Sequence, residues 1–318
     1  MKITIKKTST AGKRKAVYPP PIKKGDIIGL VAPAGSLINK ENFTAGIKFL
    51  EKKGFRVRFN RKIFNAKGYL AGTDQERADE FNMIWADPEV KALVAARGGY
   101  GCLRMVDLID MNLIRKTPKI LIGFSDLTLL LNTINKKTRL VTFHGPVITT
   151  LTDINTQSKK RFLDTLLGHA STQLSPAGLK IIKGGKAKGT LLGGNLTTLA
   201  HMIGTPYEIT WQGAILFIED TGEKPYSLDR LLTYLSKSGR LQKIKGLILG
   251  TFSDEDRKER SLLQKGVNER IAELFATEDI PIWANFPTGH SRRNITLPVG
   301  SEVEMDTSAN KLSFYCKS

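Results

Sequence analysis

The chain has 318 residues, a formal net charge of +19 and 41% hydrophobic residues, enough to bury a large core in about two domains. No apolar run approaches the roughly 20 residues of a membrane span, and the N-terminus lacks the apolar stretch of a secretory signal. We therefore expect a cytoplasmic protein with no membrane association. The two cysteines, Cys102 and Cys316, stand outside any CxxC spacing, so we expect neither a disulfide framework nor a cysteine-rich metal site.

The positive charge is concentrated at the start of the chain. Eight Lys and Arg residues precede Asp26, and no acidic residue does. This predicts a flexible basic leader over residues 1–22. Because no zinc-finger spacing, aromatic RNA-binding run or basic helix with periodic arginines occurs, we expect no nucleic-acid partner.

From Asp26 onward, short apolar runs alternate with amphipathic segments, which is typical of a largely parallel sheet with helices. The predicted strands of the first half are 27–32, 55–59, 92–95, 120–124 and 140–143, and the predicted helices are 40–53, 75–86 and 127–134. These elements predict a Rossmann-like N-terminal α/β domain over residues 23–165.

The apolar signal weakens after Thr150 and returns near residue 189. The stretch 166–188, rich in Gly and Lys near its end, is therefore a predicted linker. Predicted strands at 214–218, 247–252 and 282–284 and predicted helices at 228–235 and 262–275 follow. They predict a smaller C-terminal α/β domain over residues 189–318.

A serine stands at the turn between a predicted strand and a predicted helix. The apolar strand passes through Gly123 and Ser125 into an apolar helical stretch. A serine there is exposed, as in a nucleophile elbow, and the following helix N-terminus favours developing negative charge. Leu127 replaces the second glycine of the hydrolase motif, so the alternative that Ser125 or Asp126 merely caps the helix stays open.

A serine nucleophile needs a base and a carboxylate that orients the base. Among the four histidines, His290 stands in a glycine-flanked loop after a strand, where functional residues concentrate. Glu219 and Asp220 end an apolar strand, at the edge where α/β sheets build their sites, and we favour Glu219. The alternatives are that His290 satisfies a local hydrogen bond and that one carboxylate caps the turn at Gly222.

A glycine-rich run over residues 96–101 follows another predicted strand, so its backbone N–H groups could line an anion or oxyanion site. The run lacks the G-x-G-x-x-G spacing, and residues 184–190 lack the lysine of a phosphate-binding loop. No carboxylate-rich metal loop occurs either. We therefore expect neither a cofactor nor a metal ion.

Several short motifs stand in a fixed order between residues 23 and 306. They are Val31–Ser36, Gly68–Arg77, Ala96–Gly101, Gly123–Asp126, His144–Pro146, Gly193–Leu196, Gly204–Tyr207, Ile218–Asp220, Gly289–His290 and Leu297–Gly300. In this combination the chain resembles the LD-carboxypeptidase family of serine peptidases. That family also includes the enzymes that inactivate the peptide-nucleotide antibiotic microcin C.

The resemblance implies roles for the candidate residues. Ser125 would attack, His290 would act as general base and then general acid, and Glu219 would orient His290. Backbone N–H groups would form the oxyanion hole, at Asp126, Gly98 and Gly99. The active site would lie between the N-terminal lobe, which carries Ser125, and the C-terminal lobe, which carries Glu219 and His290. As residues that hold the carboxylates of the substrate we expect Arg97, Asn195 and Arg292.

The resemblance also implies an activity. LD-carboxypeptidases remove the terminal D-alanine from murein tetrapeptides in the cytoplasm, by cutting the L,D-peptide bond before it, and this reaction serves peptidoglycan recycling. We expect a murein peptide as substrate, and a homodimer, since dimers are common in the family.

Two alternatives remain at this stage. The first is a microcin C immunity-type peptidase that uses the same triad on a peptidyl-aminoacyl-nucleotide. An aromatic side chain placed to stack on a nucleobase would favour it, and Trp211 and Trp283 are the candidates. The second is a non-catalytic peptide-binding protein on the same scaffold, since fold alone does not imply function.

Overall fold

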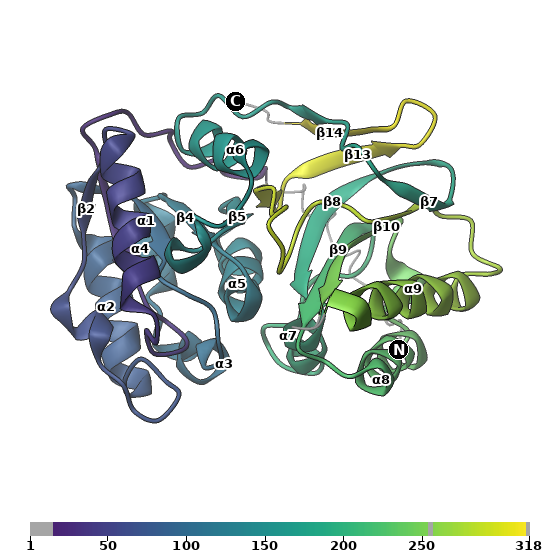
Figure 1. Ribbon diagram of the computed structural model, residues 1–318, viewed down its shortest axis with the longest axis horizontal. Helices are drawn as coiled ribbons and strands as arrows, with labels where there is room; N and C mark the ends of the chain where they lie inside the picture. Colours follow the sequence, from purple (N-terminus) through teal and green to yellow (C-terminus); the bar gives the residue numbers. More distant parts are fainter. Residues whose placement is uncertain (1–14, 254–256, 316–318) are drawn as a thin grey trace, which may run out of the picture.

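Two α/β lobes lie side by side in the computed structural model, which describes residues 15–253 and 257–315 (Figure 1). Each lobe is built around one β-sheet with helices packed on it. Within these ranges, no helix combines the length and the apolar character needed to cross a membrane. The predicted fold class, a two-lobed α/β protein with a largely parallel first sheet, is confirmed.

The first sheet has six strands in the order β12-β5-β4-β3-β1-β2; β12 is antiparallel to β5, and the other strands run parallel. The strands are β1 Ile27–Val31, β2 Arg56–Arg58, β3 Val90–Ala95, β4 Ile120–Gly123, β5 Thr142–His144 and β12 Leu297–Val299. The helices of this lobe are α1 Lys40–Lys52, α2 Asp74–Ala86, α3 Cys102–Met105, α4 Met111–Lys116, α5 Thr128–Thr138 and α6 Thr156–Leu166, with 3₁₀ turns η1 Arg61–Phe64, η2 Val106–Leu108, η3 Ser125–Leu127 and η4 Ile148–Thr150.

Both faces of the first sheet are buried. Successive residues of a strand point to opposite faces, and neighbouring residues of β1 belong to different hydrophobic clusters. Leu30 of β1 belongs to one hydrophobic cluster with Phe43 of α1, and Val31 belongs to the other cluster with Phe81 of α2. The apolar runs of the sequence are therefore strands covered on both sides. Polar chemistry is left to the ends of the strands.

The second sheet has eight strands in the order β6-β14-β13-β8-β9-β10-β11-β7, with a parallel centre from β8 to β11 and antiparallel strands on both sides. The strands are β6 Gln173–Leu174, β7 Lys180–Lys183, β8 Lys186–Asn195, β9 Ala214–Thr221, β10 Gly246–Ser253, β11 Ile282–Ala284, β13 Glu302–Asp306 and β14 Lys311–Tyr315. The helices are α7 Leu196–Met202, α8 Pro225–Lys237 and α9 Arg257–Leu274, with the 3₁₀ turn η5 Leu241–Lys243.

The two halves of the chain are interleaved. Strand β12 comes from the C-terminal half, yet it pairs with β5 of the first sheet, with Leu297 opposite His144. The predicted linker over residues 166–188 contains β6 and β7, which pair with β14 and β11 of the second sheet. The connection is thus partly built into the second sheet, and the exact domain boundaries stay a prediction.

Part of the predicted leader is fixed in place, which corrects the expectation of flexibility for residues 17–22. Val17 forms a parallel bridge with Leu140, and its backbone bonds to Arg139 and Val141. Ile22 donates its N–H to the carbonyl of Leu166 at 2.8 Å and is buried. These apolar residues hold the segment against the first lobe. Residues 1–14, with most of the leader's charge, lie outside the described residues.

A carboxyl group is buried beneath the first sheet. Glu80 of α2 accepts a hydrogen bond from the backbone N–H of Ala32 at 3.2 Å, and its other oxygen has no partner among the described residues. Burial raises the pKa of Glu80 to about 7, against an ordinary value of 4.5, although the bond from Ala32 opposes the rise. The folded protein therefore binds this proton more tightly than the unfolded chain does.

We expect Glu80→Gln to stabilise the protein at about pH 8, by about 2 kcal/mol, and to have little effect below about pH 5. The free energy of unfolding of the unmodified protein should fall as pH rises from about 4.5 to about 7, because folding opposes ionisation of Glu80 across this window. Thermal unfolding of both proteins over this range checks the prediction. The neighbouring exposed residue supplies the control, Asp79→Asn, which should show no such pH-dependent gain.

Candidate active site

Ser125 lies at a strained turn directly after β4. Its φ is +64°, in the left-handed region that a residue with a side chain rarely adopts. No side-chain cap is formed at the start of η3 or of α5, and the Asp126 carboxylate instead accepts the backbone N–H of Cys102 at 2.8 Å. The alternative that Ser125 or Asp126 caps the following helix is therefore wrong. The turn has the form of a nucleophile elbow.

The glycine-rich turn packs against this serine. A Cβ added at Gly98 would lie 2.7 Å from Cβ and 2.8 Å from Oγ of Ser125, so only glycine lets the turn approach this closely. Gly99 has a φ of +118° and lies against Gly35. The bond from Cys102 to Asp126 fixes the far end of the turn to the elbow. The predicted oxyanion-hole residues therefore lie beside Ser125.

We expect Gly98→Ala to lower kcat/KM by about tenfold or more, because the added methyl must displace the side chain of Ser125 and reactions depend steeply on such placement. The melting temperature should change little. A matched control is Gly266→Ala on α9, where an added Cβ meets nothing within 4 Å. Equal activity of the two variants in a peptidase assay would contradict the prediction.

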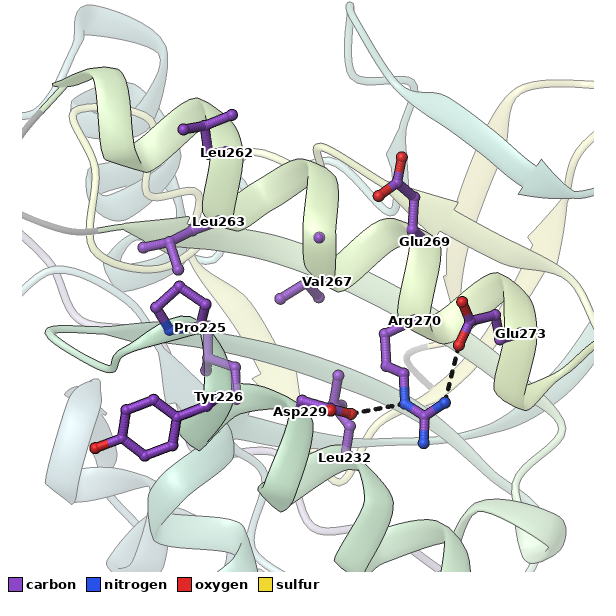
Figure 2. A pocket seen from close by; sticks show the side chains of 12 residues that line it. Pro225, Tyr226, Asp229, Leu232, Leu262, Leu263, Val267, Glu269, Arg270 and Glu273 are labelled. Carbon is purple, nitrogen blue, oxygen red and sulfur yellow. Dashed lines mark hydrogen bonds and ion pairs between the residues drawn. The ribbon is translucent and has the colours of Figure 1, made fainter.

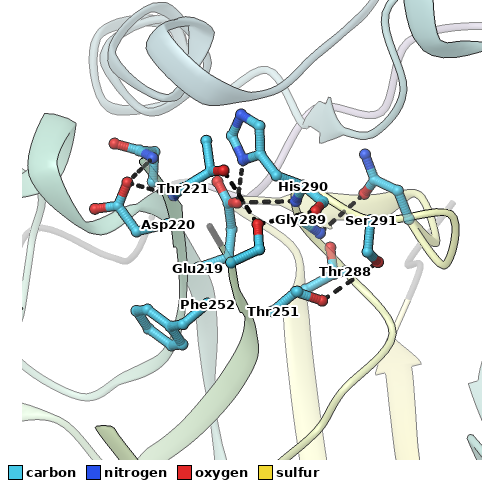
Figure 3. Close-up of polar contacts among 12 residues, drawn as sticks. Glu219, Asp220, Thr221, Thr251, Phe252, Thr288, Gly289, His290 and Ser291 are labelled. Carbon is cyan, nitrogen blue, oxygen red and sulfur yellow. Dashed lines mark hydrogen bonds and ion pairs between the residues drawn. The ribbon is translucent and has the colours of Figure 1, made fainter. Parts of the chain in front are cut away.

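Glu219 and His290 form a hydrogen-bonded pair at the adjoining end of the second sheet. His290 Nδ1 lies 2.6 Å from Oε2 of Glu219, and the His290 backbone N–H donates to the same oxygen at 3.2 Å (Figure 3). Glu219, on β9, is fully buried, whereas the His290 side chain keeps 20% of its surface exposed. The pair leaves the other ring nitrogen of His290 free of Glu219.

Two residues shape the loop that carries His290. An added Cβ at Gly289, whose φ is +105°, would lie 2.6 Å from Oε2 of Glu219, so the close approach of this loop requires glycine. The backbone N–H of Gly289 donates to the side-chain oxygen of Asn294 at 3.1 Å, and Asn294 is buried. Sequence analysis missed Asn294, although its place close after His290 in the same loop is a usable signal.

The charges of the pair stabilise each other. Burial alone would raise the pKa of Glu219, but the charge of His290 and its hydrogen bonds hold that pKa below its usual value. Burial would lower the pKa of His290, and the charge and hydrogen bond of Glu219, with the charge of Asp220, raise it instead. Glu219 is thus a carboxylate that favours the protonated imidazole, as a general base requires.

A small cavity joins the two halves of the site. It has a volume of about 240 Å³ and is lined by residues of both lobes, Phe124, Thr150, Asp153, Ile154, His290, Ser291, Arg292 and Asn294. The ring of Phe124, directly before Ser125, lies 4.6 Å from the ring of His290 between centroids. Phe124, the residue before Ser125, and His290, the partner of Glu219, therefore meet at one cavity.

The three predicted substrate-binding residues have different surroundings. Arg292 lines the cavity and donates Nε–H to the carbonyl of Asp153 at 3.1 Å. Arg97 adjoins the Gly98 turn and donates to the carbonyl of Ser36 at 2.6 Å.

Asn195 is buried and caps helix α7. Its side-chain oxygen accepts the N–H of Thr198 at 3.0 Å, and its amide donates to Asp220 at 2.7 Å. These bonds use both ends of the side chain. Asp220 also accepts from Thr197 at this helix start and from the backbone N–H of Thr221. The N–H of Gly222 is bonded to the carbonyl of Ser253 instead, so Asp220 does not cap that turn.

A second hollow, of about 440 Å³, lies between α8 and α9 (Figure 2). Arg270 of α9 extends across it to Asp229 of α8 at 2.8 Å, and it also pairs with Glu273 of its own helix at 2.9 Å. It is the larger hollow, but its lining includes none of the candidate catalytic residues. Chemistry is therefore sought in the smaller cavity. Within the described ranges, no group of three or more His, Cys, Asp or Glu side chains is placed to hold a metal ion.

The chain is similar to known proteins over most of its length. The sequence pattern of the LD-carboxypeptidase N-terminal domain matches residues 28–145, and that of the LD-carboxypeptidase C-terminal domain matches residues 188–305. The chain is 38% identical over 298 residues to a "Probable murein peptide carboxypeptidase" of Bacillus subtilis, covering 91% of each chain. It is 31% identical to a murein tetrapeptide carboxypeptidase of Pseudomonas aeruginosa, covering 88% of this chain and 92% of the relative.

Relatives with another named role are similar too. The microcin C7 self-immunity protein MccF of Escherichia coli is 30% identical, with 92% of this chain and 94% of that protein covered. Among solved structures, an MccF-like protein from Bacillus anthracis superposes with a TM-score of 0.86 at 26% identity, over 95% of this chain and all of that one.

Proposed function

The chain belongs to the LD-carboxypeptidase family, and we propose that it is a serine carboxypeptidase that hydrolyses the L,D-peptide bond before the terminal D-alanine of murein tetrapeptides. One observation carries the proposal: the 2.6 Å bond between Glu219 and His290 stands at the same cavity as the strained turn of Ser125. A buried carboxylate, an imidazole and a serine at a strained strand-to-helix turn are the parts of a nucleophilic triad.

In the proposed reaction, Oγ of Ser125 attacks the carbonyl carbon of the L,D-peptide bond while His290 takes the hydroxyl proton. Glu219 holds the imidazole in the orientation that presents its other nitrogen and stabilises the imidazolium. Backbone N–H groups of Asp126, Gly98 and Gly99 stabilise the oxyanion. His290 then protonates the departing amine of D-alanine, and water hydrolyses the acyl-enzyme with His290 again as base.

Arg292 is the proposed partner of the terminal carboxylate. A carboxypeptidase must recognise a free carboxylate one residue beyond the scissile bond, and Arg292 is the guanidinium that lines the cavity together with His290. Arg97, beside the Gly98 turn, is proposed to face the remainder of the peptide. Asn195 is left out of this proposal, because both ends of its side chain are engaged in capping α7 and bonding Asp220.

We expect Arg292→Gln to raise KM for the tetrapeptide by about tenfold or more with a smaller effect on kcat, since a charge-assisted hydrogen bond to the substrate is lost. With a C-terminally amidated peptide, the difference in KM between Arg292→Gln and the unmodified protein should shrink. The neighbouring arginine provides the control, Arg293→Gln, since Arg293 is outside the cavity lining and donates to the carbonyl of Ala177 instead. Equal KM values for both variants would contradict the assignment.

A second candidate function is cleavage of a microcin C-like peptidyl-aminoacyl-nucleotide. Neither tryptophan suggested by the sequence can stack on a nucleobase, because Trp211 and Trp283 are buried and their indole N–H groups are bonded to Glu208 and Thr307. A different observation favours this function. The exposed rings of Tyr69 and Tyr100 lie 5.9 Å apart, next to the Gly98 turn, and offer a stacking surface.

Mass spectrometry decides between the two candidates. The purified protein is incubated with a murein tetrapeptide ending in D-alanine and, separately, with processed microcin C, in both cases beside the Ser125→Ala variant. Tripeptide and free D-alanine from the unmodified protein alone would support the carboxypeptidase. Cleavage of microcin C alone would favour the second function, and cleavage of neither would favour a non-catalytic peptide-binding protein.

The compartment and the oligomeric state of the proposed enzyme are inferred from its family. We propose that it works in the cytoplasm on peptides released during peptidoglycan recycling and that it forms a homodimer. Sedimentation at working concentration tests the dimer, and fractionation of cells tests the compartment. We also keep the domain limits 23–165 and 189–318 as proposals.

A further inference from the structure

A second histidine lies behind the proposed triad. His144, the last residue of β5, is fully buried, and neither of its ring nitrogens has a hydrogen-bond partner among the described residues. A neutral imidazole always carries one N–H donor and one acceptor. Because a buried polar group without a partner is costly, a histidine kept in such a place calls for an explanation.

The His144 ring lies between the two halves of the site. Its centroid is 6.0 Å from the ring of Phe124 and 5.0 Å from the ring of Phe217, both in edge-on contacts. Phe124 directly precedes Ser125, and Phe217 stands two residues before Glu219 on the same strand, hence on the same face. His144 thus contacts the neighbour of the nucleophile in one sheet and the neighbour of the carboxylate in the other.

Glu219 has an unused acceptor in the same region. Both of its bonds from His290 go to Oε2, and the buried Oε1 has no partner among the described residues. His144 is close enough to Glu219 and to His290 for their charges to act on its ring. A buried donor and a buried acceptor, each unpaired, therefore lie in one small region.

We propose that His144 is a positioning residue: its ring N–H donates to Oε1 of Glu219 through one buried water, and its ring keeps the turn of Ser125 in register with β9. The inference rests on the proposed roles of Ser125, Glu219 and His290. His144 touches no reacting atom and acts through Glu219 and Phe124.

The neutral state of His144 is part of this role. Burial lowers the pKa of His144 to about 4; the charge of Glu219 opposes that shift and the charge of His290 adds to it. These two groups are the charges that bear on His144, and Glu219 and Asp220 are those that bear on His290. Without the N–H donor of His144, the Glu219 carboxylate loses a stabilising hydrogen bond. Its charge then depends more on a protonated His290, so the pKa of His290 should rise.

The test is an NMR titration of the whole protein with isotope-labelled histidine. The chain has four histidines, and the two exposed ones, His169 and His201, are assigned by substitution to glutamine. In His144→Phe, which keeps an aromatic ring but no N–H, we expect the pKa of His290 to rise by about half a unit or more. His144→Asn and His144→Gln keep a donor, and at least one should restore the original value. His169→Phe is the control and should leave it unchanged.

Three results would overturn the proposal. One is a His144→Phe protein in which His290 titrates as before. Another is an equal shift in the Phe, Asn and Gln variants, which would mean that His144 only fills space. The third, needed if the variants fail to fold, comes from the unmodified protein: ring nitrogen shifts showing that His144 carries no hydrogen-bonded N–H, or that it becomes protonated near its ordinary pKa.

The titration needs no substrate, so its outcome is separate from that of the proposed function. A shift of His290 in a protein that cleaves no tetrapeptide would leave the link between His144 and Glu219 standing and remove the carboxypeptidase. Where cleavage is found, kcat of His144→Phe should fall about tenfold while KM stays within about twofold, because the supporting contact orients the base and binds no substrate.

Discussion

Replacement of Ser125 by alanine is expected to lower kcat for tetrapeptide cleavage by about 10³-fold or more, as loss of a triad nucleophile generally does. In the proposed mechanism this hydroxyl forms the acyl-enzyme, and no other hydroxyl shares its strained turn beside Gly98. KM should change little, because the cavity beside His290 stays intact. Steady-state kinetics with purified protein measures both constants.

The fold of the Ser125→Ala protein should survive. Ser125 has a φ of +64°, which alanine tolerates no better than serine does, so a small loss of stability is expected and circular dichroism and melting curves should remain close to those of the unmodified protein. His169→Ala, at an exposed position outside the site, serves as the control and should keep full activity. A folded Ser125→Ala protein that still cleaves the tetrapeptide would refute the mechanism.

Glu219→Gln is expected to lower kcat by about 10³-fold or more, comparable to the loss of the orienting carboxylate in other triads. The amide is close in shape, but it no longer favours the imidazolium and can present N–H to Nδ1 of His290, which selects the wrong tautomer. The carboxylate that raises the pKa of His290 is also gone. The acid limb of the remaining activity should therefore move to lower pH.

Measuring kcat of Glu219→Gln as a function of pH tests both the loss of activity and the shift of the acid limb. An exposed glutamate on α9 provides the matched change, Glu269→Gln, which should alter neither kcat nor the pH profile. If Glu219→Gln kept its acid limb in place and lost less than about tenfold in kcat, the carboxylate would have no orienting role.

Much of the first lobe could be predicted because its strands are buried on both faces and read as continuous apolar runs. Strands β1, β3 and β4 begin and end within two residues of the predicted ranges. The second sheet was harder to predict. Strand β8 begins with exposed lysines and contains glycines, a composition typical of a linker, and its central position is set by pairing with β9 and β13.

The residues of the candidate site also differ in how far the sequence could predict them. Ser125 and His290 follow apolar strands and Glu219 stands near the end of one, a local pattern that is visible in the sequence. Asn195 ends β8 directly before α7, which begins Leu-Thr-Thr. This is a capping position, and the structure uses it so. His144 could not be linked to Glu219 from the sequence, because their proximity depends on how the two sheets pack.

The loop of His290 runs from β11 in one sheet to β12 in the other, so its position depends on both. On the proposed mechanism, a chain in which only the first lobe has folded would have the nucleophile Ser125 without its base His290. A chain with only the second lobe would have the base without the nucleophile. Nascent or partly unfolded molecules should therefore be inert. On the proposed mechanism, hydrolysis requires both sheets to be in place.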